Sequence, residues 1–249
     1  MQLSETLKNK LAHAEKLVFF TGAGISAESG VSTFRGEDGI WNKFKPEELA
    51  SFQAFMKNAD MVWDWYQYRR KIIHDVMPNA AHLAITELQN YYPSVVVVTQ
   101  NIDNLHTRAG NKEVYELHGN IERNFCSACK KRFDFVTFDN GKSVPRCDCG
   151  GLIRPDVVWF GESLPDDQYS AGEDAADACD VFFSIGTSSI VYPAAYIPLR
   201  AKSARKYVVE INLAETEQSR YFDELIPGKA GEILPAVVEE IKKFKKPIS

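Results

Sequence analysis

The sequence has no long apolar run, and no stretch approaches the roughly 18 consecutive apolar residues of a membrane-spanning helix. Its first 16 residues lack the apolar centre of a signal peptide. Basic residues are not in excess, since 29 Lys and Arg against 34 Asp and Glu give a net charge of -5. That balance offers no electrostatic reason to expect nucleic acid as the main partner. We therefore expect a cytoplasmic globular protein that has no membrane partner and no direct nucleic-acid partner.

Cysteine is also scarce, and the five cysteines are unevenly placed. Four form two close pairs, Cys126 with Cys129 and Cys147 with Cys149. In a chain without an export signal, this grouping indicates a metal site before a disulfide framework. Two pairs about twenty residues apart are typical of a zinc ribbon, although the second pair is one residue short of the usual spacing. We expect one structural zinc ion on these four thiolates, with Cys179 as a small core residue.

Four apolar runs of β-branched and aromatic residues show no polar alternation, as in strands that are buried on both faces. They cover residues 17–20, 95–98, 181–185 and 207–211. Helix-like segments lie between them, including residues 79–91 with Asn79 as the N-cap and residues 193–204, which open on a proline. Alternation of strand and helix predicts an α/β fold built on a Rossmann-like, doubly wound parallel sheet.

Two stretches interrupt this alternation. Residues 36–75 contain no strand-like run and are rich in aromatic residues, which predicts a helical module. Residues 124–152 hold the cysteine pairs of the predicted zinc ribbon. We expect one unit, 1–249, in which these two insertions form a small domain on a large Rossmann-like part made of 1–35, 76–123 and 153–249.

The first apolar run leads directly into the pattern G-x-G-x-x-A, with Gly22, Gly24 and Ala27. After a strand, this pattern predicts a turn whose backbone approaches a pyrophosphate, with the amides of a helix N-terminus facing the charge. The alternative is a tight strand-to-helix turn without a ligand. The acidic residue that usually follows about 20 residues later is missing, so a dinucleotide would be held differently than in a dehydrogenase.

Polar residues follow the other apolar runs. They are Gln100, Asn101 and Asp103 after the second run, residues 186–188 after the third, and Asn212 after the fourth. Ligands of parallel sheets bind outside the carboxyl ends of the strands, so these residues should face one ligand. His118 follows a short predicted strand at 114–117, and its ordinary pKa suits proton transfer near neutral pH. A structural histidine is the alternative for His118, and it is the favoured interpretation for His82 and His106.

Read in order, these motifs resemble those of the sirtuins, a family of NAD-dependent protein lysine deacylases. The resemblance covers nearly the whole length. It rests on GAGISAESGVSTFRG at 22–36, TQNIDNLH at 99–106, LHG at 117–119, the cysteine pairs, RPDVVWFGE at 154–162, GTSSIVYP at 186–193 and IN at 211–212. The family fold is a Rossmann-like domain that carries a zinc ribbon and a helical module, in agreement with the two insertions.

The resemblance implies a set of NAD-binding residues: Gly22, Ala23, Gly24, Ala27, Glu28, Phe34, Arg35, Trp41, Gln100, Asn101, Ile102, Asp103, Gly186, Thr187, Ser188, Asn212, Leu213 and Ala230. It implies Asn101 and His118 as catalytic residues, with His118 as the general base on the ribose hydroxyls. By the family mechanism the acyl oxygen attacks the anomeric carbon of the NAD ribose and nicotinamide leaves. The products are free lysine, nicotinamide and an O-acyl-ADP-ribose.

The resemblance also implies substrate-binding residues. Val158, Trp159, Phe160, Gly161 and Glu162 would pair edge-on with the substrate backbone. Tyr66 and Arg69 are three residues apart and share a helix face, where a phenol beside a guanidinium suits a carboxylate. These two positions match the sirtuin branch that removes succinyl and malonyl groups, and Ala50 matches its small residue. We expect a desuccinylase and demalonylase that also deacetylates. The alternative is a helix with an aromatic core face and a solvated arginine.

Other functions remain open at this stage. The same loss of nicotinamide could end on a protein side chain, which would make the protein an ADP-ribosyltransferase. A non-enzymatic reader could bind NAD and hold a partner with its zinc ribbon. A nicotinamide dehydrogenase is disfavoured by the missing acidic ribose contact. For the deacylase we expect acyl-lysine proteins as partners and a monomeric state.

Overall fold

The computed structural model describes residues 2–33, 45–133 and 143–248, and its larger sheet has six parallel strands. In spatial order the strands are β3 (Glu113–Glu116), β2 (Ser94–Thr99), β1 (Lys16–Thr21), β7 (Val181–Ile185), β8 (Tyr207–Asn212) and β9 (Glu224–Pro227). The chain winds outward from the centre in both directions, so the order reverses between β1 and β7. This confirms the predicted doubly wound sheet, whose ligand site is expected at that reversal.

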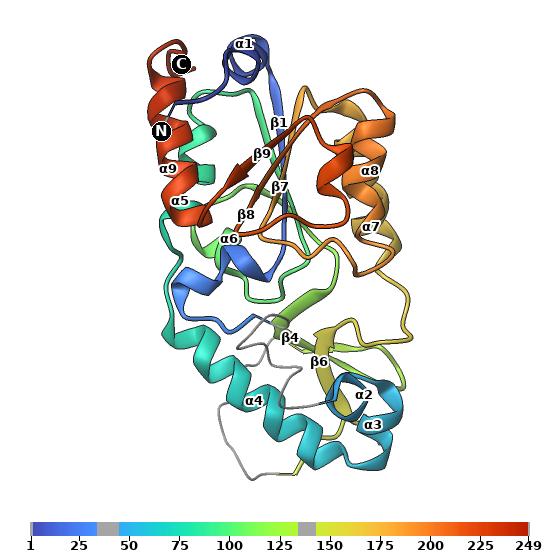
Figure 1. Cartoon of the computed structure of the whole chain (residues 1–249). Coiled ribbons are helices and arrows are strands. Elements are labelled where there is room, and N and C mark those ends of the chain that lie inside the picture. The colour runs from blue at the N-terminus through green and yellow to red at the C-terminus, as the bar shows by residue number, and fades with distance from the viewer. Residues whose placement is uncertain (1, 34–44, 134–142, 249) are drawn as a thin grey trace.

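Helices cover both faces of the larger sheet (Figure 1). One face carries α1 (Glu5–His13), α5 (Ala80–Leu88) and α9 (Ala230–Lys242), and the other carries α7 (Asp166–Ala178) and α8 (Tyr196–Ser203). No helix in the described residues is both long and apolar enough to cross a bilayer.

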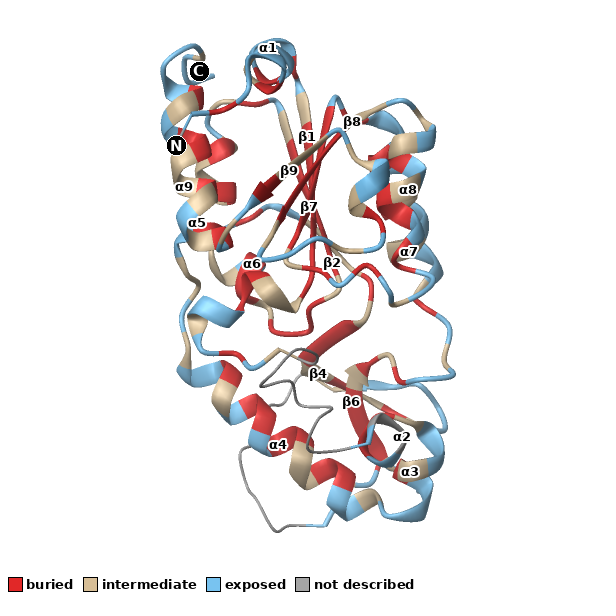
Figure 2. Ribbon diagram, viewed as in Figure 1, coloured by how far each residue is buried: buried red, intermediate tan, exposed pale blue. Residues whose placement is uncertain are grey.

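Strand β1 shows why the apolar runs do not alternate. Leu17 and Phe19 enter the core under α1, α5 and α9, whereas Val18 and Phe20 enter the core under α7 and α8. All four side chains are fully buried, and Figure 2 shows most of the length of the central strands as buried. A strand whose two faces are both covered needs apolar residues at every position.

The small part lies below the larger sheet in Figure 1 and has a core of its own. Its antiparallel sheet has the order β5 (Arg132–Phe133), β4 (Gly119–Cys126) and β6 (Ile153–Val157). Its helices are α2 (Pro46–Leu49), α3 (Phe52–Lys57) and α4 (Ala59–Asp75). The helical module and the ribbon are both present, and the small sheet extends into residues 119–123 and 153–157. The domain boundaries themselves stay a prediction.

Two predicted helices agree with the structure only in part, since α5 ends at Leu88 and not at residue 91. Helix α5 begins after Asn79, whose Oδ1 accepts from the N–H of Ala81 at 2.9 Å, so the predicted N-cap is correct. The sequence predicted that helix α8 begins at Pro193, but in the structure it begins at Tyr196. The Tyr196 N–H bonds to the carbonyl of Pro193 at 2.9 Å, a pairing three residues apart that closes a turn before the helix starts.

Candidate functional site

Four strand ends of the larger sheet meet through three side-chain amides. Asn101, after β2, donates from Nδ2 to the carbonyl of Gly22, after β1, at 3.1 Å. Gln100 donates from Nε2 to Oγ1 of Thr187, after β7, at 2.9 Å. Asn212, at the end of β8, donates to the carbonyl of Thr187 at 2.8 Å. The polar strand ends that the sequence predicted to face one ligand do lie together.

The turn after β1 differs from the predicted one. Two short 3₁₀ helices, η1 (Ala23–Ile25) and η2 (Ala27–Ser29), stand where an α-helix N-terminus was expected. The glycines are needed for packing within the protein: a Cβ on Gly22 would lie 2.8 Å from the carbonyl oxygen of Gly186, and one on Gly24 would lie 2.7 Å from its Cα. The backbones of the two turns are therefore pressed together.

Ser26 joins the turn to the strand end and was missed by the sequence analysis. Its Oγ donates to Oδ2 of Asp103 at 2.7 Å and accepts from Nδ2 of Asn101 at 3.2 Å. Asp103 also accepts from the N–H of Leu105 at 3.0 Å. Burial raises the pKa of Asp103, and these hydrogen bonds oppose the rise. The only signal for Ser26 was its place inside the G-x-G-x-x-A motif.

His118 is held in one tautomer. Its Nδ1 lies 2.9 Å from the backbone oxygen of Gln100. Because a carbonyl can only accept, Nδ1 carries the hydrogen, and in the neutral ring Nε2 keeps its lone pair. Burial lowers the pKa of His118, and the bond to Gln100 opposes that shift. The ring is therefore neutral at neutral pH and can act as a general base through Nε2.

Two further histidines, His82 and His106, form a pair next to these strand ends. The rings of His82 and His106 are 4.8 Å apart between centroids, and burial lowers the pKa of His82 to about 4. Nε2 of His106 lies 3.0 Å from Oγ1 of Thr21, which donates to Oγ1 of Thr99 at 2.8 Å. Thr99 in turn accepts from the N–H of Asn101 at 3.0 Å. Both histidines are buried and structural, and they support the Asn101 backbone.

A small pocket opens in front of this network. It is lined by Ala23, Ser26, Val31, Ser32, Arg69, Ile73, Asn101, Ile102 and Asp103. The wall thus joins the turn after β1, the strand end after β2 and helix α4 of the small part. Four predicted cofactor residues, Ala23, Asn101, Ile102 and Asp103, share it with the predicted substrate residue Arg69.

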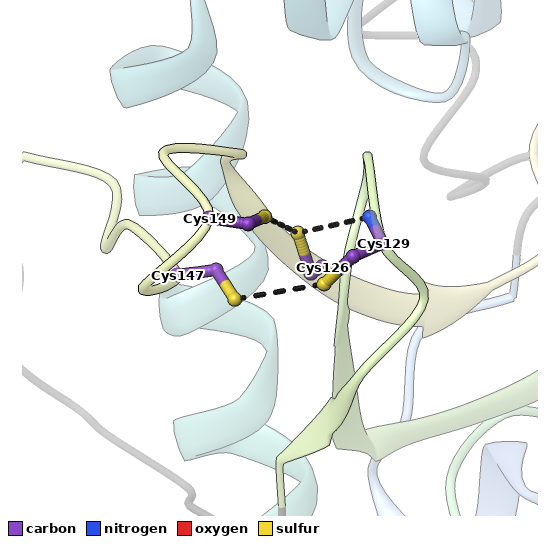
Figure 3. A group of neighbouring side chains, drawn as sticks. All are labelled: Cys126, Cys129, Cys147 and Cys149. Atoms are coloured by element: carbon purple, nitrogen blue, oxygen red, sulfur yellow. Dashed lines mark hydrogen bonds between the residues drawn. The ribbon is translucent and has the colours of Figure 1, made fainter.

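The four paired cysteines converge in the small part (Figure 3), where their sulfur atoms all lie within 4.8 Å of one another. Sγ of Cys126 is 3.5 Å from that of Cys149, and Sγ of Cys129 is 3.7 Å from that of Cys147. Four thiolates at about 2.3 Å from a tetrahedral zinc lie roughly 3.8 Å apart, so the cluster fits the ion. The shortened second pair does not prevent this geometry. Cys179 is buried elsewhere, as predicted.

Comparison with known proteins identifies the family. Residues 22–193 match the model of the Sir2 family. The chain belongs to the Sir2 family. An NAD-dependent protein deacylase of Pyrococcus furiosus is 46% identical over 242 residues, which cover 95% of this chain and 97% of the relative. NAD-dependent protein deacylase 2 of Pyrobaculum aerophilum is 48% identical over 234 residues, 94% of each chain.

Solved Sir2 structures superimpose on nearly the whole chain. A Sir2 homolog–NAD complex is 42% identical with a TM-score of 0.91 and covers 97% of this chain and 95% of its own. A Sir2 homologue variant with 2′-O-acetyl-ADP-ribose is 42% identical with the same TM-score of 0.91, covering 97% of each. A Sir2 protein bound to an acetylated peptide is 31% identical with a TM-score of 0.86, covering 98% of this chain and 100% of its own.

In this Sir2 protein, Tyr66 and Arg69 are both buried on α4, with exposed fractions of 2% and 6%. The predicted alternative of a solvated arginine is therefore wrong. Cζ of Arg69 lies 5.2 Å from the centroid of the Trp65 ring. The Tyr66 hydroxyl accepts from Nε1 of Trp159 at 2.8 Å, and burial raises the pKa of Tyr66 to about 12. The phenol is neutral and the guanidinium reaches the pocket wall.

Four backbone N–H groups in residues 158–162, the segment after β6, already donate hydrogen bonds within the protein, and two of them bond to other segments. The N–H of Val158 bonds to the carbonyl of His118 at 3.0 Å, and the N–H of Phe160 bonds to the carbonyl of Ala50 at 2.8 Å. The Phe160 side chain is 48% exposed, whereas that of Trp159 is buried. Pairing of residues 158–162 with a substrate backbone stays a prediction.

The remaining predicted NAD residues are exposed, bond to other parts of the protein, or lie outside the described residues. Oε2 of Glu28 accepts from the N–H of Gly231 at 2.7 Å, which places a carboxylate at the N-terminus of α9 beside Ala230. Ser188 and Leu213 are exposed. Three more predicted residues, Phe34, Arg35 and Trp41, lie outside the described residues. The NAD contacts of all these positions stay predictions.

Proposed function

We propose that the protein is an NAD-dependent protein deacylase that removes acetyl groups, and preferentially succinyl and malonyl groups, from lysine side chains. The observation that carries the chemistry is the neutral His118, whose Nδ1 is fixed by Gln100 so that Nε2 is left as a base. The activity agrees with the names of its relatives and with the NAD and 2′-O-acetyl-ADP-ribose found in similar structures.

The polar groups of the pocket fit the nicotinamide end of NAD. Asp103 uses its carboxylate oxygens for Ser26 and Leu105 and still has lone pairs to accept from an amide. Asn101 is fixed at both its backbone and its side chain. When bound, NAD would supply the anomeric ribosyl carbon to which the acyl oxygen bonds as nicotinamide leaves. His118 would accept a proton at Nε2 from the ribose hydroxyls.

The four cysteines would hold one structural zinc ion. All four ligand positions of the cluster are thiolates, so a tetrahedral ion has no open position for substrate or water. The ion would tie β4 to the loop that leads into β6.

The preference for acidic acyl groups is argued from Tyr66 and Arg69. Arg69 lies on the wall of the pocket that would take the nicotinamide end of NAD, and its buried guanidinium would favour a carboxylate on an acyl group beside that end, because charge-assisted hydrogen bonds are strongest where water is excluded. The small side chain of Ala50 lies in the same core as Tyr66. Acyl-lysine proteins would be the partners, and we expect a cytoplasmic monomer.

The test is NAD-dependent nicotinamide release on two matched peptides, one with acetyl-lysine and one with succinyl-lysine. We expect Arg69→Met to lower kcat/KM for the succinyl peptide about tenfold to a hundredfold and to leave the acetyl peptide within about twofold. Arg69→Lys keeps the charge but loses the two-pronged geometry, so its loss should be intermediate. Equal effects of Arg69→Met on both peptides would remove the basis for an acidic acyl preference.

A further inference from the structure

Trp159 makes a side-chain contact that the predicted backbone pairing does not require. Its Nε1 donates to the hydroxyl of Tyr66 at 2.8 Å, across 93 positions in the sequence. The exposed fractions of the two side chains are 1% and 2%, so the bond is shielded from water. The indole N–H can only donate, so the phenol oxygen must be the acceptor.

The indole ring is itself firmly held. Cζ of Arg154 lies 3.4 Å from the centroid of the Trp159 ring. Glu162 pairs with Arg154 and also accepts from the backbone N–H of Trp159 at 2.9 Å. Phe55 packs on the same indole at 5.2 Å between centroids. The position of Nε1 is therefore set by packing, ion pairing and backbone bonding together.

The bond determines what the phenol can do. A hydroxyl that accepts from one side keeps its single hydrogen for another partner. Because burial raises the pKa of Tyr66 to about 12, that hydrogen stays on the oxygen at neutral pH. Accepting a hydrogen bond also polarises the O–H bond and strengthens it as a donor.

Tyr66 and Arg69 lie three residues apart on α4, and the charge of Arg69 acts on the Tyr66 hydroxyl. Arg69 lines the pocket in front of Asn101 and Asp103. The phenol and the guanidinium therefore offer one neutral and one charged donor from the same face of α4.

We propose that Trp159 is a positioning residue for acyl selectivity, whose indole N–H orients the Tyr66 hydroxyl so that its hydrogen meets the carboxylate of an acidic acyl group held by Arg69. The inference rests on the proposed function and deepens it. Trp159 would not touch the acyl group itself; it would act through Tyr66.

The test compares four variants, Trp159→Phe, Tyr66→Phe, the double variant and Phe55→Leu, on the matched succinyl and acetyl peptides. Trp159→Phe removes the N–H and keeps an aromatic ring. We expect it to lower the ratio of kcat/KM for the succinyl peptide to kcat/KM for the acetyl peptide about fivefold to tenfold, mainly through KM for the succinyl peptide. In the Tyr66→Phe background it should cause no further loss of selectivity, since its acceptor is gone.

Phe55→Leu is the packing control. Phe55 packs against the Trp159 indole ring, but its side chain forms no hydrogen bond with the Tyr66 hydroxyl. Phe55→Leu should change kcat/KM for the succinyl and acetyl peptides by the same factor. If Trp159→Phe also lowers both peptides alike, its role is structural and the inference is wrong. If Arg69→Met abolishes the succinyl preference and Trp159→Phe does not change it, only the role of Trp159 fails. If Arg69→Met changes nothing, the proposed acyl preference fails, and this inference fails with it.

A measurement on the unsubstituted protein covers the case in which Trp159→Phe does not fold. The indole N–H resonance of Trp159 is followed by NMR during titration with each peptide without NAD. The inference predicts that the succinyl peptide shifts the resonance and that the acetyl peptide shifts it less. Only the succinyl group has a carboxylate that can accept a hydrogen bond from the Tyr66 hydroxyl. Equal shifts with both peptides, or none, would overturn it.

Discussion

The Nδ1 atom of His118 donates to the backbone oxygen of Gln100 at 2.9 Å. This bond fixes the tautomer, and burial lowers the pKa of the ring, so His118 is neutral at the pH where the enzyme would work. The proposed reaction depends on His118 as its general base.

His118→Ala should lower kcat for deacylation by about a hundredfold to ten-thousandfold, which is the usual contribution of a general base. NAD binding, measured by calorimetry, should survive because the strand-end amides remain. His13→Ala is the control, since His13 is exposed on α1. Full turnover by His118→Ala would exclude it as the base.

The pH profile of kcat/KM gives a second test of His118. The base is active when deprotonated, and its pKa is lowered from 6.5, so activity should persist below pH 6.5 and fall only as pH drops through the shifted value. An acid limb centred above pH 6.5, from a group that disappears in His118→Ala, would contradict the assigned environment.

Acid should destabilise the fold through His82. Its folded-state pKa of about 4 lies below its ordinary value of 6.5, so the unfolded chain binds more protons between these two values. The free energy of unfolding should be highest above pH 6.5 and fall as pH drops towards 4, by about 3 kcal/mol from this group. Urea unfolding across this range measures the free energy of unfolding, and His82→Gln is expected to flatten its slope against pH. An unchanged slope in His82→Gln would assign the effect to other groups.

Removal of zinc should unfold the small part. The four cysteine sulfurs lie within 4.8 Å of one another, and without an ion the zinc–sulfur bonds that would join them are lost. A strong chelator should release about one zinc per chain and lower Tm, and Cys129→Ser should reproduce the loss. Cys179→Ser is the control, since that thiol lies outside the cluster. Full zinc content in Cys129→Ser would contradict the four-cysteine site.

Ser26→Ala should destabilise the protein because it removes the hydroxyl that donates to Oδ2 of the buried Asp103 at 2.7 Å and leaves the carboxylate with the N–H of Leu105. We expect the free energy of unfolding to fall by about 1–3 kcal/mol, as for other buried polar groups that lose a partner. Ser203→Ala, which removes an exposed hydroxyl on α8, should change it far less. Equal stability of Ser26→Ala and the unsubstituted protein would show that the bond contributes little.

Much of the architecture could be predicted because the signals are local. The run 17–20 is apolar at every position since β1 is covered on both faces, and the polar residues after β2, β7 and β8 meet because parallel strands end at the same edge. The cysteine spacing located the cluster without any knowledge of the fold.

The rest depends on long-range packing that no local pattern reports. Ser26 meets Asp103 across 77 positions, and Trp159 meets Tyr66 across 93. The 3₁₀ turns after β1 replace the expected helix where Gly22 and Gly24 are pressed against Gly186. Such contacts depend on how the larger sheet packs against the small part, so the local sequence does not predict them.

The most direct measurement is the mass-spectrometric identification of all products from an acyl-lysine peptide and NAD. The account predicts equal amounts of free-lysine peptide, nicotinamide and O-acyl-ADP-ribose, with all three lost in His118→Ala. Nicotinamide accompanied by ADP-ribose on a protein side chain, with the acyl group still on lysine, would contradict it and make the protein a transferase of ADP-ribose.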